Sequence, residues 1–251
     1  MKVLQNLFLV TGMTLFIASC GDTERAAVSV PLEYSEQLID ELQGTDFSIV
    51  LNDMNVAEED GKDLFQHKYH ILKVIKDSLV VDSLDWKTVN RGFFTKHENN
   101  LGMEIVSNHN NKLSRVAKPV GFDWAVGNEK HGQWEVEDST KTNSGTTRRY
   151  WRSHRSSGIF WYWMLSRRSY QRDYAGHRAY STAGRTYYGN NANGTTTYGT
   201  NSAYQKTKRS SFFTRRSTSS TWKLFSTRKS ASSSRYNGAS TTRSKSGGFG
   251  K

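Results

Sequence analysis

The charges of this 251-residue chain are divided between two unlike halves. Residues 1–140 contain 13 Lys and Arg against 22 Asp and Glu, whereas residues 141–251 contain 22 Lys and Arg and a single acid, Asp173. The net charge of +12 therefore combines an acidic first half with a strongly basic second half. This division predicts two parts that differ in structure and in the partners that they attract.

The basic half ends in a segment of low sequence complexity. In residues 181–251, 41 of the 71 positions are Ser, Thr, Gly or Asn. Such a segment has few aliphatic side chains to bury, so burial cannot offset the entropy lost when its backbone is ordered. The chain has only two prolines, which disfavours a stiff polyproline structure. We therefore expect a disordered, flexible basic tail over residues 181–251.

The acidic half has the periodicities of regular secondary structure. Residues 33–43 carry three apolar side chains at helical spacing, and Gly44 follows them as a stop signal. The period then changes to two in residues 47–52 and again in residues 64–75, where β-branched and aromatic side chains alternate with polar ones. These patterns predict one helix followed by two strands, and residues 79–86 are a further short strand candidate.

Two hairpins are expected after these strands. The segments MEIVSN and KLSRVAKPV flank a turn-like HNN cluster, and in residues 120–137 apolar side chains alternate on both sides of Gly127-Asn128. We therefore predict the α+β class, with one N-terminal helix packed on a small antiparallel sheet. Residues 32–140 would form this acidic domain, and its order of helix and then meander resembles that of cystatins.

The amino-terminal segment has the parts of a secretory leader. Lys2 provides a positive start, and the mostly apolar residues 3–19 end in small side chains. This run is short and interrupted for a membrane span, which needs about 20 consecutive apolar residues. We therefore interpret residues 1–19 as a signal peptide.

The leader ends in Ile17-Ala18-Ser19-Cys20, which resembles the lipobox of bacterial lipoprotein precursors. The resemblance implies cleavage between Ser19 and Cys20 and a thioether-linked diacylglycerol on Cys20. It also implies a lipid anchor on the exported side of the bacterial cell membrane or outer membrane, followed by a tether over residues 20–31. Cys20 is the only cysteine, so an internal disulfide is excluded. The alternative is a buried structural cysteine beside an anchor helix that is never cut.

Residues 141–180 are basic and rich in aromatic side chains, with a short apolar run over residues 159–165. This run is too short to cross a bilayer as a helix. It fits a strand buried on both faces. It also fits an interfacial membrane insertion, because Trp and Tyr favour the headgroup level and the flanking arginines would meet lipid phosphates. A patch that binds a partner is the third interpretation.

The tail interleaves basic and aromatic residues, a pattern that suits an anionic lipid or envelope polymer. Basic side chains are attracted to anionic surfaces, and aromatic side chains add burial at the headgroup level or stacking. The same composition would suit RNA, but export disfavours nucleic acid as a partner. The candidate residues for binding an anionic surface are Lys206, Lys208, Arg209, Phe212, Phe213, Arg215, Arg216, Trp222, Lys223, Phe225, Arg228 and Lys229.

No catalytic or metal-binding pattern is recognisable in the sequence, and no cofactor is predicted. His67 and His70 would face opposite sides of a strand, so they are interpreted as histidines on the surface of the sheet. Asp123 and Glu129 lie near the predicted 120–137 turn, where acids are usually solvated. Phosphate-loop, dinucleotide and serine-elbow signatures are absent from the sequence.

Two functional interpretations follow. The first is a lipid-anchored, non-enzymatic envelope protein with a structural or binding role, whose basic tail contacts anionic lipid or polymer. The second is an enzyme or ligand-binding lipoprotein with a pocket near Trp124 and Trp134, which would stack on a sugar unless they are core residues. Deleting residues 181–251 should weaken binding to anionic vesicles or envelope polymers and leave the body folded.

Overall fold

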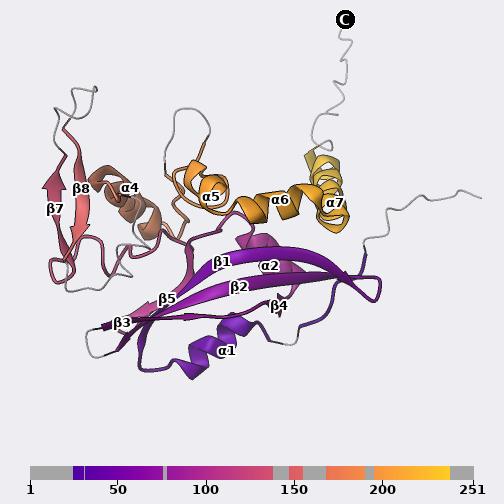
Figure 1. Ribbon diagram of the computed structural model, residues 1–251, viewed down its shortest axis with the longest axis horizontal. Helices are drawn as coiled ribbons and strands as arrows, with labels where there is room; N and C mark the ends of the chain where they lie inside the picture. Colours follow the sequence, from indigo (N-terminus) through magenta and orange to yellow (C-terminus); the bar gives the residue numbers. More distant parts are fainter. Residues whose placement is uncertain are drawn as a thin grey trace, which may run out of the picture.

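An antiparallel sheet with helices packed against it forms most of the molecule (Figure 1). The computed structural model describes residues 25–30, 32–75, 78–137, 147–154, 168–189 and 195–237. The α+β class with an antiparallel sheet is therefore confirmed. The predicted signal peptide, residues 20–24 and 31 of the tether, and the apolar run over residues 159–165 lie outside the described residues.

The main sheet has the strand order β3-β2-β1-β5-β6, and β4 also pairs with β2. β5 returns to the second edge of β1, so the sheet is not the simple meander that the cystatin comparison implied. Its strands are β1 (Asp46–Glu59), β2 (Lys62–Ile75), β3 (Ser78–Ser83), β4 (Lys87–Val89), β5 (Glu104–His109) and β6 (Lys112–Ser114). A separate two-stranded sheet is formed by β7 (Gly132–Val136) and β8 (Arg149–Ser153).

A β-bulge keeps the long strand β1 in phase with the core. Its pairing with β2 shifts between Leu51 and Asp53, so Leu51 faces Tyr69 and Met54 faces His67. The extra residue changes which side of β1 the alternating side chains occupy. Without it, the apolar residues beyond Leu51 would turn away from the face that buries the rest of the strand.

The prediction of a single helix is wrong, because the described residues contain six. The predicted helix is confirmed as α1, but tertiary contacts order five more that have little apolar periodicity. The helices are α1 (Tyr34–Glu41), α2 (Arg91–His97), α4 (Gln171–Thr182), α5 (Ala203–Lys208), α6 (Ser210–Thr218) and α7 (Ser220–Asn237).

The largest core cluster combines one face of the sheet with side chains from the predicted tail. Phe212, Trp222 and Phe225 are at most 3 % exposed and pack with strand residues and with Phe94 of α2. The prediction of a disordered tail is therefore wrong for residues 195–229. The sheet supplies most of the apolar surface, so a few aromatic side chains are enough to hold these Ser- and Thr-rich helices.

The predicted hairpin over residues 120–137 is also wrong. Its first part forms successive turns, and β7 pairs instead with β8, with Trp134 opposite Trp151. Phe122 and Trp124 enter different core clusters, so their alternation does not mark one face of a strand. The other predicted hairpin is confirmed as β5 and β6, joined at Asn110.

Candidate anion-binding surface

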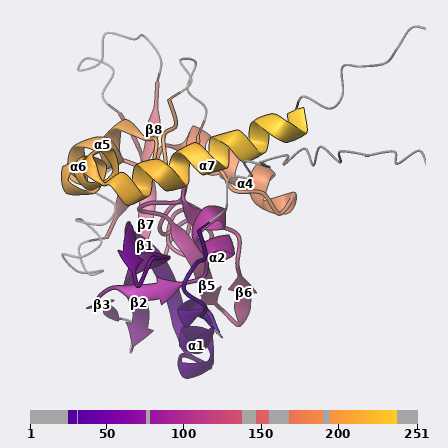
Figure 2. The ribbon, with the colours of Figure 1, turned by 90° about the vertical axis from the view of Figure 1, so that its right-hand side faces the viewer.

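Ion pairs join the basic C-terminal helices to the acidic sheet. Arg215 of α6 donates to Asp53 at 2.7 Å, and Arg228 of α7 donates to Asp63 at 3.1 Å. Lys229 of α7 forms a further ion pair with Glu98. The charge division in the sequence therefore serves, in part, to hold the two halves of one chain together. Figures 1 and 2 show α5, α6 and α7 together along one side of the sheet.

Arginines from these helices also bind the backbone of β1 at its bulge. β1 pairs with β5 only up to Val50, which leaves its later carbonyl groups without a strand on that side. Arg209 donates to the carbonyl and side-chain oxygens of Asn52, and Arg215 donates to the carbonyl of Met54 at 3.2 Å. The helices thus satisfy a sheet edge that would otherwise be open.

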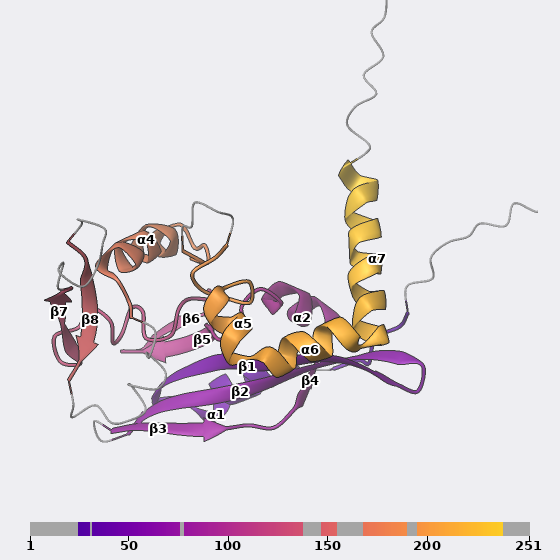
Figure 3. The same cartoon turned by 45° about the horizontal axis from the view of Figure 1, so that its top comes forward.

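Asp63 brings the start of the described chain next to α7. Its carboxylate is 1 % exposed and lies between Arg228 at 3.1 Å and Arg25 at 3.8 Å. Arg25 comes five residues after Cys20, and five residues span at most about 18 Å. The start of the described chain therefore lies beside the end of the sheet from which α7 extends (Figure 3).

The predicted surface-binding residues divide into three groups in the structure. Arg209, Arg215, Arg228 and Lys229 bind the body, as described above. Phe212, Trp222 and Phe225 are core residues and are not available to a surface, while Phe213 packs against Phe212. Exposed or half-exposed cations remain at Lys206, Lys208, Arg216 and Lys223.

Side chains beside the exposed cations offer apolar contact. Leu224 is 45 % exposed next to Lys223 on α7, and the guanidinium of Arg216 lies over the ring of Trp222. A cation beside an exposed aliphatic side chain suits a boundary between headgroups and acyl chains.

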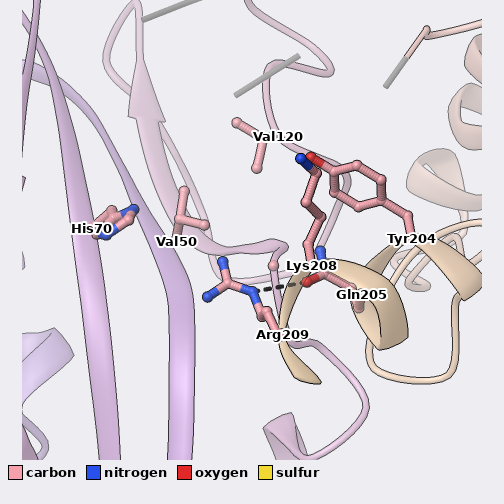
Figure 4. Close-up of a pocket in the computed structure, with 8 residues that line it drawn as sticks. Val50, His70, Val120, Tyr204, Gln205, Lys208 and Arg209 are labelled. Atoms are coloured by element: carbon pink, nitrogen blue, oxygen red, sulfur yellow. Dashed lines mark hydrogen bonds between the residues drawn. The ribbon is translucent and has the colours of Figure 1, made fainter. Parts of the chain in front are cut away.

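A cavity of about 160 Å³ lies where α5 meets the sheet (Figure 4). It combines residues from β1, β2, two loops and one helix, and it contains two of the predicted anion-binding residues. Its lining has no Asp or Glu and is formed by Val50, His70, Gly102, Val120, Tyr204, Gln205, Lys208 and Arg209.

Arg209 is a charged group whose hydrogen-bond partners are neutral. Its Nε donates to Gln205 Oε1 at 2.8 Å, and its Nη1 donates to the oxygens of Asn52. Burial lowers the pKa of the Arg209 guanidinium, which nevertheless stays charged at neutral pH. Burial and the charge of Arg209 together lower the pKa of His70, so the imidazole beside the cavity is kept neutral.

The loop before β5 positions α5. Gly102 has a φ of +75°, and a Cβ there would lie 1.9 Å from Nε2 of Gln205. Thr200, just before α5, donates to the Glu98 carbonyl at 2.6 Å and accepts from the Leu101 amide at 3.1 Å. Sequence reasoning missed this contact, because it joins residues about 100 positions apart and no local pattern marks it.

The interpretation of His67 as a histidine on the surface of the sheet is wrong. This side chain is completely buried, and its Nδ1 lies 3.0 Å from the Tyr69 hydroxyl. Burial and then the neighbouring His97 lower its pKa well below the usual value. His67 is therefore a neutral core residue. Within the described residues, no group of three or more His, Cys, Asp or Glu could hold a metal ion.

The tryptophans proposed to stack on a sugar are packed in the protein. Trp124 is 5 % exposed and donates from its ring nitrogen to Glu104 at 2.8 Å. Trp134 lies edge-on to Trp151 with ring centroids 5.0 Å apart, and it also contacts Tyr174. Trp124 is therefore a core residue, and Trp134 belongs to a second cluster around Trp151.

Asp123 and Glu129 are both exposed, but the Asp123 carboxylate also binds two side chains. The Asp123 carboxylate lies 2.8 Å from His177 Nε2 and 3.1 Å from Lys118 Nζ. Burial opposes its ionisation, but the hydrogen bond from His177 and the charge of Lys118 hold its pKa well below the usual range. This arrangement ties α4 to the turn segment before β7.

Comparison with protein-family models, curated proteins and solved structures gave no match to this chain. None of these comparisons therefore points to a catalytic activity or to any other function. Among the residues that the structure describes, no helix is both long and apolar enough to cross a membrane. The features of the chain that bear on its function are therefore the lipobox resemblance, the basic helices and the cavity beside α5.

Proposed function

We propose that this chain is a lipid-anchored protein of the bacterial envelope with a non-enzymatic, structural or binding role. Its C-terminal helices contact anionic lipid or an anionic envelope polymer. The observation that supports this best is the convergence at Asp63. Arg25, close to the proposed anchor at Cys20, and Arg228, on α7, both approach that one carboxylate. A protein held through Cys20 would therefore present α7 near the membrane surface.

Charge and burial favour a contact that is made of several weak interactions. Each Lys or Arg near an anionic membrane contributes about 1 kcal/mol, so three or four exposed cations would give useful but salt-sensitive binding. Leu224 would add apolar burial. Asp173 is the only acid after residue 140, so the C-terminal helices contain no carboxylate to oppose this attraction.

The anchor is tested by labelling cells with an alkyne fatty acid and separating membranes. We expect the wild-type chain to be labelled and to sediment with the membranes, and Cys20→Ala to do neither. Equal labelling of both chains, or labelling of neither, would overturn the lipid anchor.

The basic surface is tested on the full Cys20→Ala chain with vesicles of phosphatidylglycerol and phosphatidylcholine. We expect Lys206→Gln with Lys223→Gln to weaken vesicle binding about 30-fold, because each lysine contributes about 1 kcal/mol. The matched control changes Lys112 and Lys130 to Gln, which removes the same charge from exposed sites outside α5–α7. Equal losses in the two double variants would mean that net charge, rather than this surface, governs binding.

A further inference from the structure

We propose that the cavity between α5 and the sheet is a binding pocket for a phosphate group, held by Lys208 and Arg209. The pocket would accept the phosphate of a lipid headgroup or of a phosphodiester polymer. This inference rests on the proposed function and deepens it, because it names a ligand chemistry and a defined site within the basic surface.

The charge around the cavity favours an anion. Two cations line it and no carboxylate does. The nearby acid Asp53 already binds Arg215 at 2.7 Å, and the partners of Arg209 are neutral oxygens. A partly buried charge is costly, and the carboxylate that acts on Arg209 from a distance, that of Asp53, is shared with Arg215, so a bound anion would lower that cost.

The arrangement of donors favours phosphate over a planar carboxylate. Arg209 uses Nε and Nη1 in bonds to Gln205 and Asn52, so it does not present its full two-nitrogen fork to the cavity. Lys208 comes from the neighbouring position and lines the same cavity as Arg209 (Figure 4). Donors from two separate cationic side chains suit a tetrahedral group with several oxygens.

The size and the walls of the cavity agree with this ligand. A volume of about 160 Å³ accommodates a phosphate with a small organic part but not a large ligand. Val50 and Val120 form its apolar side, against which a glycerol or sugar carbon would pack. The position of Arg209 is fixed before any ligand arrives, because its bonds to Asn52 and Gln205 hold the guanidinium.

The test is calorimetric titration of the full chain, purified in detergent, with inorganic phosphate at constant ionic strength. We expect saturable binding by the wild type, and binding about tenfold weaker or worse in Lys208→Met, since a charge-assisted bond is lost. Lys206→Met is the matched control, because this lysine is on the same helix but does not line the cavity. Its affinity should equal that of the wild type. No binding by the wild type, or equal losses in both variants, would overturn the proposal.

A second variant distinguishes the loss of the Lys208 charge from an effect of the substitution on folding. Lys208→Arg keeps the positive charge, so it should restore binding to within about threefold of the wild type. All four proteins should have the same unfolding midpoint without phosphate, because both lysines are exposed. If Lys208→Arg binds as poorly as Lys208→Met at equal stability, a charge at this position is not what holds phosphate.

The source of the phosphate is assigned by two further ligands, phosphatidylglycerol vesicles and soluble poly(glycerol phosphate). The ligand that loses more affinity in Lys208→Met than in Lys206→Met is the one that enters the pocket. This design separates the two proposals. Saturable binding of inorganic phosphate without vesicle or polymer binding would support the pocket and contradict the proposed function. Vesicle binding that is indifferent to Lys208 would support the function and contradict the pocket.

Discussion

At the scale of single residues, Gly102 is constrained in two ways. It combines a left-handed backbone with close approach to Gln205, which is itself only 7 % exposed. Any side chain at this position would have to displace the amide of Gln205, which also binds Arg209 beside the cavity. A positive φ alone favours glycine at many turns, whereas the close approach of Gln205 arises because α5 docks beside this loop.

Gly102→Ala is therefore expected to destabilise the protein by about 2–4 kcal/mol, through backbone strain and the clash with Gln205. Gly44→Ala is the control, because Gly44 has a nearly identical φ of +76° and open space around its Cβ position. It should cost only about 1–2 kcal/mol. Urea unfolding of both variants measures the difference, and equal costs would show that α5 does not press on this loop.

The buried histidines predict that acid destabilises the protein. Burial, and then the charge of Lys96, lower the pKa of His97 to about 4. In the unfolded chain this histidine binds a proton near its ordinary value of 6.5, so protons favour the unfolded state between these two values. Stability should therefore fall as the pH drops below about 6.5.

The prediction is checked by urea unfolding at pH 7 and pH 5. Wild type should lose about 1–2 kcal/mol more than His97→Gln over this interval, because only the wild type has the His97 proton to bind. His154→Gln is the control, since His154 is exposed. If His97→Gln has the same pH dependence as wild type, His97 is not excluded from protonation in the folded state.

At the scale of elements, α7 shows how a sequence of weak helical pattern becomes ordered. Its first half contains two buried aromatic side chains, Trp222 and Phe225, among Ser, Thr and basic residues. Phe225 packs edge-on against Phe65 and Phe94, at ring-centroid distances of 5.3 and 5.7 Å. The helix is thus held by the sheet rather than by its own propensity.

Phe225→Ala should cost about 3–5 kcal/mol in the free energy of unfolding, because it leaves a cavity in the main core. The neighbouring Leu224 is 45 % exposed, and Leu224→Ala should change stability by less than about 0.5 kcal/mol. Urea denaturation of the two variants separates buried from exposed faces of α7. Similar small effects would mean that α7 is not docked on the sheet.

Sequence reasoning succeeded for elements whose pattern is local. The period of two over residues 64–75 predicted β2, because one face of that strand is buried from Asp63 to Ile71. It failed where neighbouring apolar side chains pack in two different clusters, as Phe122 and Trp124 do. It also failed where a polar segment is ordered by packing against a distant sheet, as happens around Phe212. The charge of Lys208 and Arg209 was evident in the sequence. The cavity was not, because its other walls come from strands far away in the chain.

At the scale of the whole molecule, the division of charge has two consequences. Part of the basic charge neutralises the acidic body through Asp53, Asp63 and Glu98. The remaining exposed lysines are displayed on α5 and α7. An acidic body and a basic C-terminal part are therefore not independent modules, as the composition suggested, but partners within one fold.

Deleting residues 181–251 should consequently unfold or strongly destabilise the body, contrary to the expectation from composition. The deletion removes Phe212, Trp222 and Phe225 from the core and leaves the bulged edge of β1 uncovered. Circular dichroism and urea unfolding of a chain ending at residue 180 would test this. Cooperative unfolding at the wild-type midpoint would contradict the packing described above.

The lipid proposed on Cys20 would place α7 against the membrane, and a fluorescent probe at position 224 tests this placement. Cys20 is the only native cysteine, so after its lipidation an introduced thiol is the one that reacts with a fluorophore. Leu224→Cys would be compared with Val136→Cys, an exposed site on β7 at the opposite end of the molecule (Figure 1). In phosphatidylglycerol vesicles with nitroxide-labelled headgroups, we expect strong quenching of the fluorophore at position 224 and little quenching at position 136. Equal quenching, or stronger quenching at position 136, would contradict it.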